Sequence, residues 1–272
     1  MRRASLVAGA VCVGLVVVLA VVSLVWLPFD PTRVDAADRL LPPLGRGHLL
    51  GTDGFGLDLF ARIMVGSRTC LVVGVVAVGI AALIGVPVGI VSGMLTGWPS
   101  QLILRAADVL YAFPALLLAI LLAAARGAST VTAMTAIGIA SIPAFVRVCR
   151  AGTLPVMSSD FVLAARAAGT DRRSIAVRHV LPNIAPVIGV QASVSFGIAI
   201  LAEAALSYLG LSAPATSPTW GRMLRDAQVY LFSNPLLALW PGLFIAIAVL
   251  GFNLLGDGLR DALDPRMREG LR

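Results

Sequence analysis

Six apolar runs, each long enough to cross a lipid bilayer, constrain the fold of this chain most. The hydrocarbon core of a bilayer takes about 20 residues of helix. Of the 272 residues, 58% are hydrophobic and 13% are charged, and this charged share is about half that of a soluble domain. The sequence therefore predicts an all-α membrane protein with six transmembrane helices and excludes a soluble globular protein. The runs cover residues 6–27, 70–95, 107–125, 130–148, 183–205 and 236–255.

The first run follows Arg2 and Arg3 and has some features of a signal peptide. Its apolar core of 22 residues is too long for one, and the residues after it, Pro28, Phe29 and Asp30, form no small-residue cleavage site. We therefore interpret residues 1–27 as the first transmembrane helix.

The segments between the runs divide the chain further. Residues 28–69 are rich in Pro, Gly and Asp, and the helical spacing of charged and apolar residues in 58–68 predicts a short helix lying at the membrane interface. Residues 70–257 form the transmembrane core, which includes polar loops at 147–182 and 206–235. Residues 258–272 form a tail.

Arginine placement predicts the orientation. With both termini on one side, that side holds 13 arginines and the other holds 8, and cytosolic segments collect basic residues. We therefore expect cytosolic N- and C-termini, a cytosolic loop at 147–182, and external segments at 28–69 and 206–235. The net charge of +7 is explained by this topology without nucleic acid.

The loop at 147–182 is the most distinctive polar segment and holds six arginines. Ser159 and Asp160 form an N-cap pair, and Gly169 can adopt the left-handed conformation that ends a helix. A second short helix is expected to begin at Thr170–Asp171 and to end before Pro182. The two helices form an elbow, which is typical of a docking surface for a soluble partner.

The spacing of small and apolar residues within the elbow resembles the EAA loop of importer-type ABC permeases, which docks on the cytosolic ATPase. Small residues let one helix face lie flat on a partner, and residues four apart share a face of the second helix. Leu163 stands where that family usually has Glu. The alternative is an ordinary basic cytosolic loop. The predicted docking residues are Ala164, Ala165, Gly169, Ile175, His179, Leu181 and Pro182.

Three further segments resemble the dipeptide, oligopeptide and nickel uptake family of ABC permeases, and specifically its second, shorter permease. They are HLLGTDGFGLDLFARIMVGSR at 48–68, LSYLGLSAPATSPTWGRML at 206–224 and GDGLRDALDPR at 256–266. Leu57 stands where the family usually has Arg. The resemblance covers most of the chain and implies the importer-type permease fold in a bacterial plasma (inner) membrane.

The resemblance also implies a function and partners. The function is a permease subunit of an ATP-driven importer for dipeptides or short oligopeptides, with nickel chelates or glutathione as alternative cargo. The partners are a second homologous permease, two ATP-binding subunits or one fused ATPase, an external substrate-binding protein and membrane lipid. The sequence contains no Walker A loop, so ATP and Mg would be bound by the partner subunits, and we expect neither enzymatic activity nor a cofactor in this chain.

Asp108 and Glu203 are the acids that lie near membrane depth. An acid in a transmembrane span is costly and is a functional hypothesis by default, so both are candidate residues of the translocation pathway. The alternative is that both lie at span ends, in interfacial water or beside an arginine such as Arg105.

Other kinds of site and protein are less well supported. His48 and His179 fall on opposite sides of the predicted membrane and cannot share a metal ion, and Cys12, Cys70 and Cys149 lack metal-ligand spacing and are expected to be small buried residues. A channel or secondary transporter is expected to need more intramembrane charges than two acids near span ends. An intramembrane enzyme would need a paired carboxylate or a Ser–His set at membrane depth.

Overall fold

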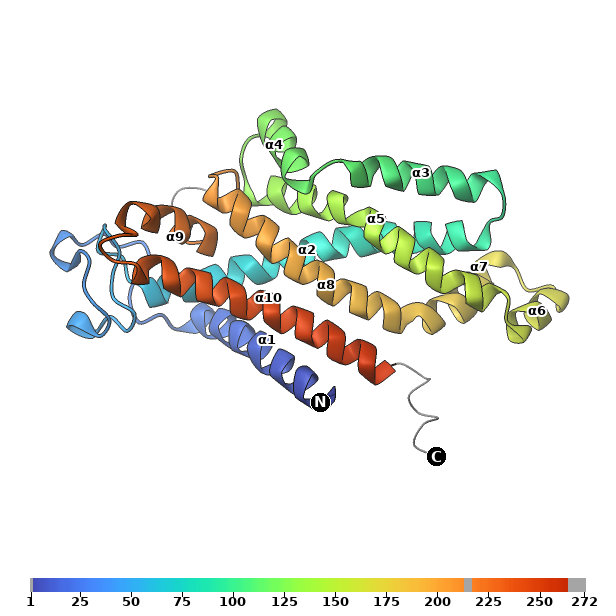
Figure 1. The fold of residues 1–272 in the computed structure, drawn as a ribbon, viewed down its shortest axis with the longest axis horizontal. Helices are drawn as coiled ribbons and strands as arrows, with labels where there is room; N and C mark the ends of the chain where they lie inside the picture. Colours follow the sequence, from blue (N-terminus) through green and yellow to red (C-terminus); the bar gives the residue numbers. More distant parts are fainter. Residues whose placement is uncertain (1, 213–216, 264–272) are drawn as a thin grey trace.

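The structure is a computed structural model that describes residues 2–212 and 217–263. Long helices run alongside one another (Figure 1), and in the described ranges the single β-type contact is an isolated bridge between Thr52 and Asp58. A π-helical turn at Ala176–Val180 joins α7 to α8. The α-helices are α1 (Arg2–Val25), α2 (Leu59–Met94), α3 (Trp98–Ala112), α4 (Ala115–Arg126), α5 (Thr130–Met157), α6 (Asp160–Ala167), α7 (Arg172–Ile175), α8 (Leu181–Tyr208), α9 (Trp220–Ala227) and α10 (Leu236–Leu263).

The prediction of six crossings is confirmed, with a break in the third. In the described part of the chain, five helices are long and apolar enough to cross a membrane, and the number is six when α3 and α4, which are bent by 78°, are counted as one broken span. A single third span at 107–125 is therefore wrong. Pro114 lacks an N–H group and favours extended backbone in the residue before it, and Phe113 has φ −81° and ψ 119°.

Two other predicted boundaries also differ. The interfacial helix at 58–68 is the first part of α2, because the Asp58 carboxylate caps that helix by accepting from the N–H of Ala61. The helix after Asp171 does not end before Pro182 but continues to Tyr208. The π-helical turn widens the helix just before Pro182, which gives room for a ring that would otherwise clash with the carbonyl one turn earlier.

The polar loops and the tail are also more helical than expected. α5 continues past Val148 to Met157, so the first third of the predicted loop at 147–182 is a continuation of that helix. The loop at 206–235 contains α9, and its residues 213–216 lie outside the described residues. α10 covers the first six residues of the predicted tail, and the rest of the tail, 264–272, lies outside the described residues.

The two ends of the bundle carry different elements. One end holds the segment before α2 together with α9, and the other holds α6 and α7 (Figure 1). We call the first the α9 end and the second the elbow end. The first turns of α1 lie beside the last turns of α10, since a Cβ on Gly258 would come within 2.8 Å of Leu6.

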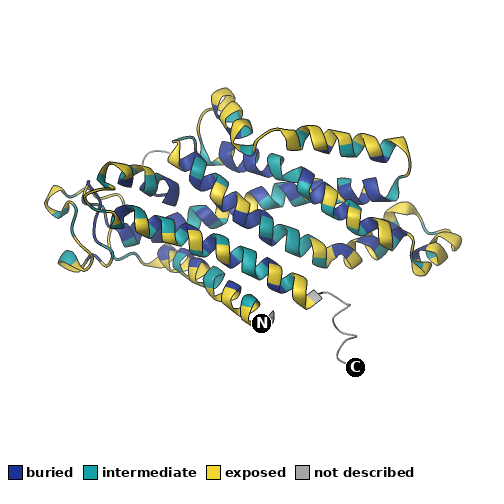
Figure 2. Cartoon of the chain, in the orientation of Figure 1, coloured by how far each residue is buried: buried dark blue, intermediate teal, exposed yellow. Residues whose placement is uncertain are grey.

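The outside of the bundle is apolar, as a lipid-facing surface is. Figure 2 shows exposed residues along the outer side of α1 and buried residues toward the middle of the bundle. Val7, Val11 and Leu24 of α1 are all more than half exposed. α2, α5 and α8 pack on one another at the centre, and α1 covers α10.

A glycine stripe brings α2 close to α5. Gly85, Gly89 and Gly93 recur every fourth residue, which places them on one face of α2. A Cβ on Gly89 would lie 2.7 Å from the carbonyl oxygen of Val146 and 2.7 Å from the Cβ of Cys149. Close approach of backbones through small residues is the usual basis of helix association in lipid.

We predict that Gly89→Leu destabilises the chain by about 1–3 kcal/mol, the cost of overpacking a tight interface. Gly79→Leu on the same helix is the matched control, because a Cβ at Gly79 meets no atom within 4 Å. The thermal aggregation midpoint of the detergent-solubilised chain measures both. Equal midpoints for the two variants would contradict the assignment of this stripe as the α2–α5 contact.

Candidate functional site

The predicted elbow at Gly169 lies at the end of the bundle, between the short helix α6 and the helix that begins at Arg172 and continues through α8. α6 ends at Ala167, and Gly169 has φ +80°. The N–H groups of Gly169 and Thr170 donate to the carbonyls of Arg166 and Ala165, both at 3.0 Å, which closes the C-terminus of α6. The Asp171 carboxylate then caps α7 by accepting from the N–H of Ser174 at 3.0 Å. A Cβ at Gly169 would meet no atom within 4 Å, so backbone conformation alone calls for glycine here.

The elbow is held to the bundle by its apolar side chains. Val162 of α6 and Ile175 of α7 are 0% and 1% exposed. They belong to one apolar cluster together with Ile90 of α2 and Met157 of α5. Ile175, a predicted docking residue, therefore supports the elbow from inside and is not accessible to a partner.

The elbow end exposes both apolar and basic side chains. Phe161 and Leu163 are 48% and 49% exposed, although the sequence analysis did not assign Phe161 to the site. The ring of Phe161 lies 6.1 Å from that of His179, measured between centroids, and His179 is partly buried. Of the other predicted docking residues, Ala165 is partly buried, and Ala164, Gly169, Leu181 and Pro182 are exposed. The exposed arginines of this end are Arg166, Arg172, Arg173 and Arg178.

Asp108 pairs with an arginine that the sequence analysis had placed in a loop. Nη2 of Arg147, on α5, donates to Oδ1 of Asp108, on α3, at 2.6 Å. The guanidinium carbon of Arg147 also lies 4.4 Å from the centroid of the Tyr111 ring. Arg147 thus takes the place that the alternative interpretation gave to Arg105. Both members of the pair are well exposed, at 43% for the Arg147 side chain and 59% for that of Asp108.

Glu203, unlike Asp108, is buried in the bundle. It is 3% exposed and lies five residues before the end of α8. The Ser212 hydroxyl donates to Oε1 of Glu203 at 3.4 Å. The structure does not bring the two candidate acids together, since Asp108 pairs on the surface of α3 while Glu203 is packed inside.

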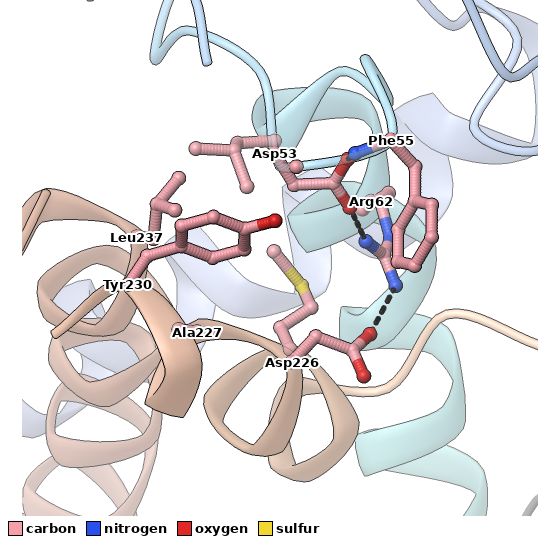
Figure 3. Close-up of a pocket in the computed structure, with 10 residues that line it drawn as sticks. Asp53, Phe55, Arg62, Asp226, Ala227, Tyr230 and Leu237 are labelled. Atoms are coloured by element: carbon pink, nitrogen blue, oxygen red, sulfur yellow. Dashed lines mark hydrogen bonds and ion pairs between the residues drawn. The ribbon is translucent and has the colours of Figure 1, made fainter. Parts of the chain in front are cut away.

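The α9 end is held together by a buried charge network. Arg62 of α2 donates to the carboxylate of Asp53, in the segment before α2, and to that of Asp226, on α9, at 3.4 Å (Figure 3). Asp53 also accepts from the backbone N–H groups of Phe55 and Leu57. Arg62 is 5% exposed, and its Nε atom has no hydrogen-bond partner in the described part of the chain. One guanidinium therefore joins three separate segments.

The segment 217–227, which contains the motif SPTWGRML at 217–224, is fixed by direct contacts to α2 and α8. The Thr219 side chain caps α9 by accepting from the N–H of Arg222 at 3.2 Å. Nε1 of Trp220 donates to the carbonyl of Ile63 at 3.1 Å, and a Cβ on Gly221 would lie 2.1 Å from the carbonyl oxygen of Ala204. The residue types of this motif are therefore explained by packing.

The remaining titratable residues do not gather into a metal site. Within residues 2–212 and 217–263, no group of three or more His, Cys, Asp and Glu side chains is arranged to hold a metal ion. His48 lies at the α9 end, where its Nδ1 is 2.8 Å from Oδ2 of Asp58, and His179 lies at the elbow end. Cys70 and Cys149 are buried, as predicted, and Cys12 is partly buried.

Comparison with known proteins identifies the family of this chain. Residues 85–269 match the family described as "Binding-protein-dependent transport system inner membrane component". The chain is 40% identical over 263 residues to the glutathione transport system permease protein GsiD of Pectobacterium atrosepticum, covering 95% of this chain and 87% of that protein. It is also 40% identical over 263 residues to the dipeptide transport system permease protein DppC of Alkalihalophilus pseudofirmus, covering 96% and 86%.

A third relative is the probable D,D-dipeptide transport system permease protein DdpC of Escherichia coli, 40% identical over 257 residues, covering 93% of this chain and 86% of that protein. The prediction of an importer-type permease is thus confirmed. In such importers ATP is hydrolysed by separate subunits, so the chain itself is not an enzyme. It is a multi-span inner-membrane protein that belongs to the binding-protein-dependent transport system inner membrane component family.

Proposed function

We propose that this chain carries dipeptides or short oligopeptides across the inner membrane, as one of two permeases that enclose the translocation path. The support is its 40% identity, over more than nine tenths of its length, to permeases named for dipeptide and glutathione transport. Dipeptides and glutathione are both short peptides that carry a free ammonium group and a free carboxylate, so glutathione is the second candidate cargo. Nickel chelates are a third.

The elbow is the proposed contact with the ATPase. Its exposed apolar side chains, Phe161 and Leu163, suit an apolar groove, and the exposed arginines of the same end suit acidic residues of the partner. Leu163 stands where relatives of this type usually have Glu, so the contact at this position is apolar rather than ionic. The ATPase consists of two ATP-binding subunits or one fused chain, and it carries the ATP and Mg. The elbow end is accordingly cytosolic.

The α9 end is the proposed contact with the external substrate-binding protein. Its three segments are tied together through Arg62 (Figure 3), so it presents one rigid surface rather than independent loops. Closure of the ATPase subunits on ATP moves the elbow, and the elbow moves the helices on which it is anchored. The path then opens toward the binding protein, and hydrolysis reverses the motion.

Purification of the complex and transport in proteoliposomes test this function. We expect the ATPase and a second permease to copurify with this chain, and the binding protein together with a dipeptide to stimulate ATP hydrolysis and uptake of labelled dipeptide. If glutathione or a nickel chelate stimulates ATP hydrolysis and dipeptides do not, that compound is the cargo instead of dipeptides. A homomeric pore that transports without an ATPase would contradict the proposal.

We predict that Gly169→Val lowers both dipeptide uptake and stimulated ATP hydrolysis by about tenfold or more, because a β-branched residue strongly disfavours the positive φ of this position. Gly169→Asn is the matched control. Asn tolerates left-handed backbone, and the space beside Gly169 is open, so we expect activity within about threefold of wild type. Normal uptake by the Val variant would contradict the docking role.

We predict that Glu203→Gln leaves dipeptide uptake within about twofold of wild type. The amide is nearly isosteric with the carboxylate, and its oxygen can accept the hydrogen bond of Ser212. Glu203 is buried, so it meets the cargo only if the surrounding helices separate. A large loss of uptake by a complex that assembles normally would place Glu203 on the path after all.

A further inference from the structure

The exposed ion pair between Asp108 and Arg147 joins two helices of the candidate membrane spans, α3 and α5. Asp108 is ten residues from the start of α3, and Arg147 is ten residues from the end of α5 and seventeen from its start. At 1.5 Å per residue, the pair lies about 15 Å from the elbow-side ends of its helices. α5 has 28 residues and is therefore about 42 Å long, so a hydrocarbon core about 30 Å thick that is centred on α5 contains the pair.

Lipid is a poor environment for these two side chains. Charges in transmembrane spans almost always face the bundle interior or a water-filled cavity, yet both side chains are about half exposed in this chain. Their open side must therefore meet water or another protein chain.

The break in the third crossing supports the same assignment. Phe113 and Pro114, between α3 and α4, are exposed and lie five and six residues beyond Asp108. Non-helical backbone at membrane depth is tolerated only where it is buried in protein or lines a water-filled cavity. Broken helices of this kind form substrate sites in other transporters. Two independent features thus mark one face of α3 as turned away from lipid.

The ion pair leaves hydrogen-bonding groups of both side chains without a partner among the described residues. Arg147 has five N–H donors, and among the described residues its guanidinium donates only to Oδ1 of Asp108. The Tyr111 ring contacts the guanidinium at 4.4 Å, and such stacking holds its plane in place. The face thus presents a partly free cation beside a partly free carboxylate.

We propose that Asp108, Arg147 and Tyr111 form a substrate-contacting site on the translocation path that receives the charged ends of short zwitterionic peptides. The peptide carboxylate binds Arg147, and the peptide ammonium group binds Asp108. Each charge exchanges one ionic partner for another, so the path keeps its net charge as the cargo passes. The peptide as ligand rests on the proposed function, whereas the exposure of the site to water does not.

Thiol accessibility tests the location of the site. In a background with Cys12, Cys70 and Cys149 changed to Ala, Asp108→Cys and Tyr111→Cys are treated with a membrane-impermeant thiol reagent in the assembled complex in nanodiscs. We expect both to react, and to react more slowly when the binding protein delivers a dipeptide. Val75→Cys is the control, because Val75 is 61% exposed on α2 within an apolar helix, and we expect it not to react. Failure of both site thiols to react, as in a dry interface with the second permease, would overturn the proposal.

Charge variants test the contact with the peptide. We expect Asp108→Asn and Arg147→Gln each to raise the KM for dipeptide uptake by roughly tenfold to a hundredfold, the effect of losing one charge-assisted hydrogen bond. Arg105→Gln is the matched control, an exposed arginine on the same helix, and we expect wild-type uptake. Wild-type KM values for both site variants would overturn the peptide contact.

A charge swap separates recognition from structure. Asp108→Arg combined with Arg147→Asp restores an ion pair between α3 and α5 with reversed positions. A purely structural pair would recover wild-type uptake, and that result would overturn the proposal. We expect the swapped complex to assemble but to keep the raised KM. Reactive site thiols in a wild-type complex that takes up no dipeptide would refute the proposed cargo while leaving this face on the path.

Discussion

The burial of Val162 and Ile175 against α2 and α5 is the contact on which the rest of the molecule depends. Fully burying side chains of this size stabilises a structure by about 1.5–3 kcal/mol each. Here the burial holds α6, which has 8 residues and could not persist alone, together with the first turn of the helix that continues into α8. The apolar cluster spans α2, α5, α6, α7 and α8. A partner that moves the elbow therefore moves the central helices with it.

The α9 end is held by a different kind of force. Arg62 is buried with two carboxylates, and such an arrangement is strongly destabilised when one partner is lost, because an unpaired charge remains in the interior. The network favours a single relative position of α9 and the segment before α2. The apolar contact at the elbow end tolerates small sliding movements better than this charge network does. The two ends thus differ in what holds them together, apolar burial at the elbow end and a buried charge network at the α9 end.

The sequence predicted the number of crossings and the elbow, because apolar runs, N-caps and glycine C-caps are local signals. It did not predict interactions between distant residues. Arg147 was assigned to a loop because an apolar run ends at a charge, whereas its partner Asp108 lies 39 positions away on another helix. Pro182 was taken as a helix end because the π-helical turn that accommodates it has no simple sequence signal. Pro114, by contrast, was visible inside an apolar run, and the break could have been predicted from it.

α5 connects the two functional regions proposed here. Its last residue, Met157, belongs to the cluster that anchors the elbow, and Arg147 lies ten residues earlier on the same helix, about 15 Å along its axis. A tilt of α5 driven from the elbow would therefore displace Arg147 relative to Asp108, which lies on the separate helix α3. Asp108 and Arg147 would separate as the ATPase moves the elbow, and both charges would become available to the cargo together. Motion at the ATPase contact and exposure of the charged site would then be one event, because a single helix carries both.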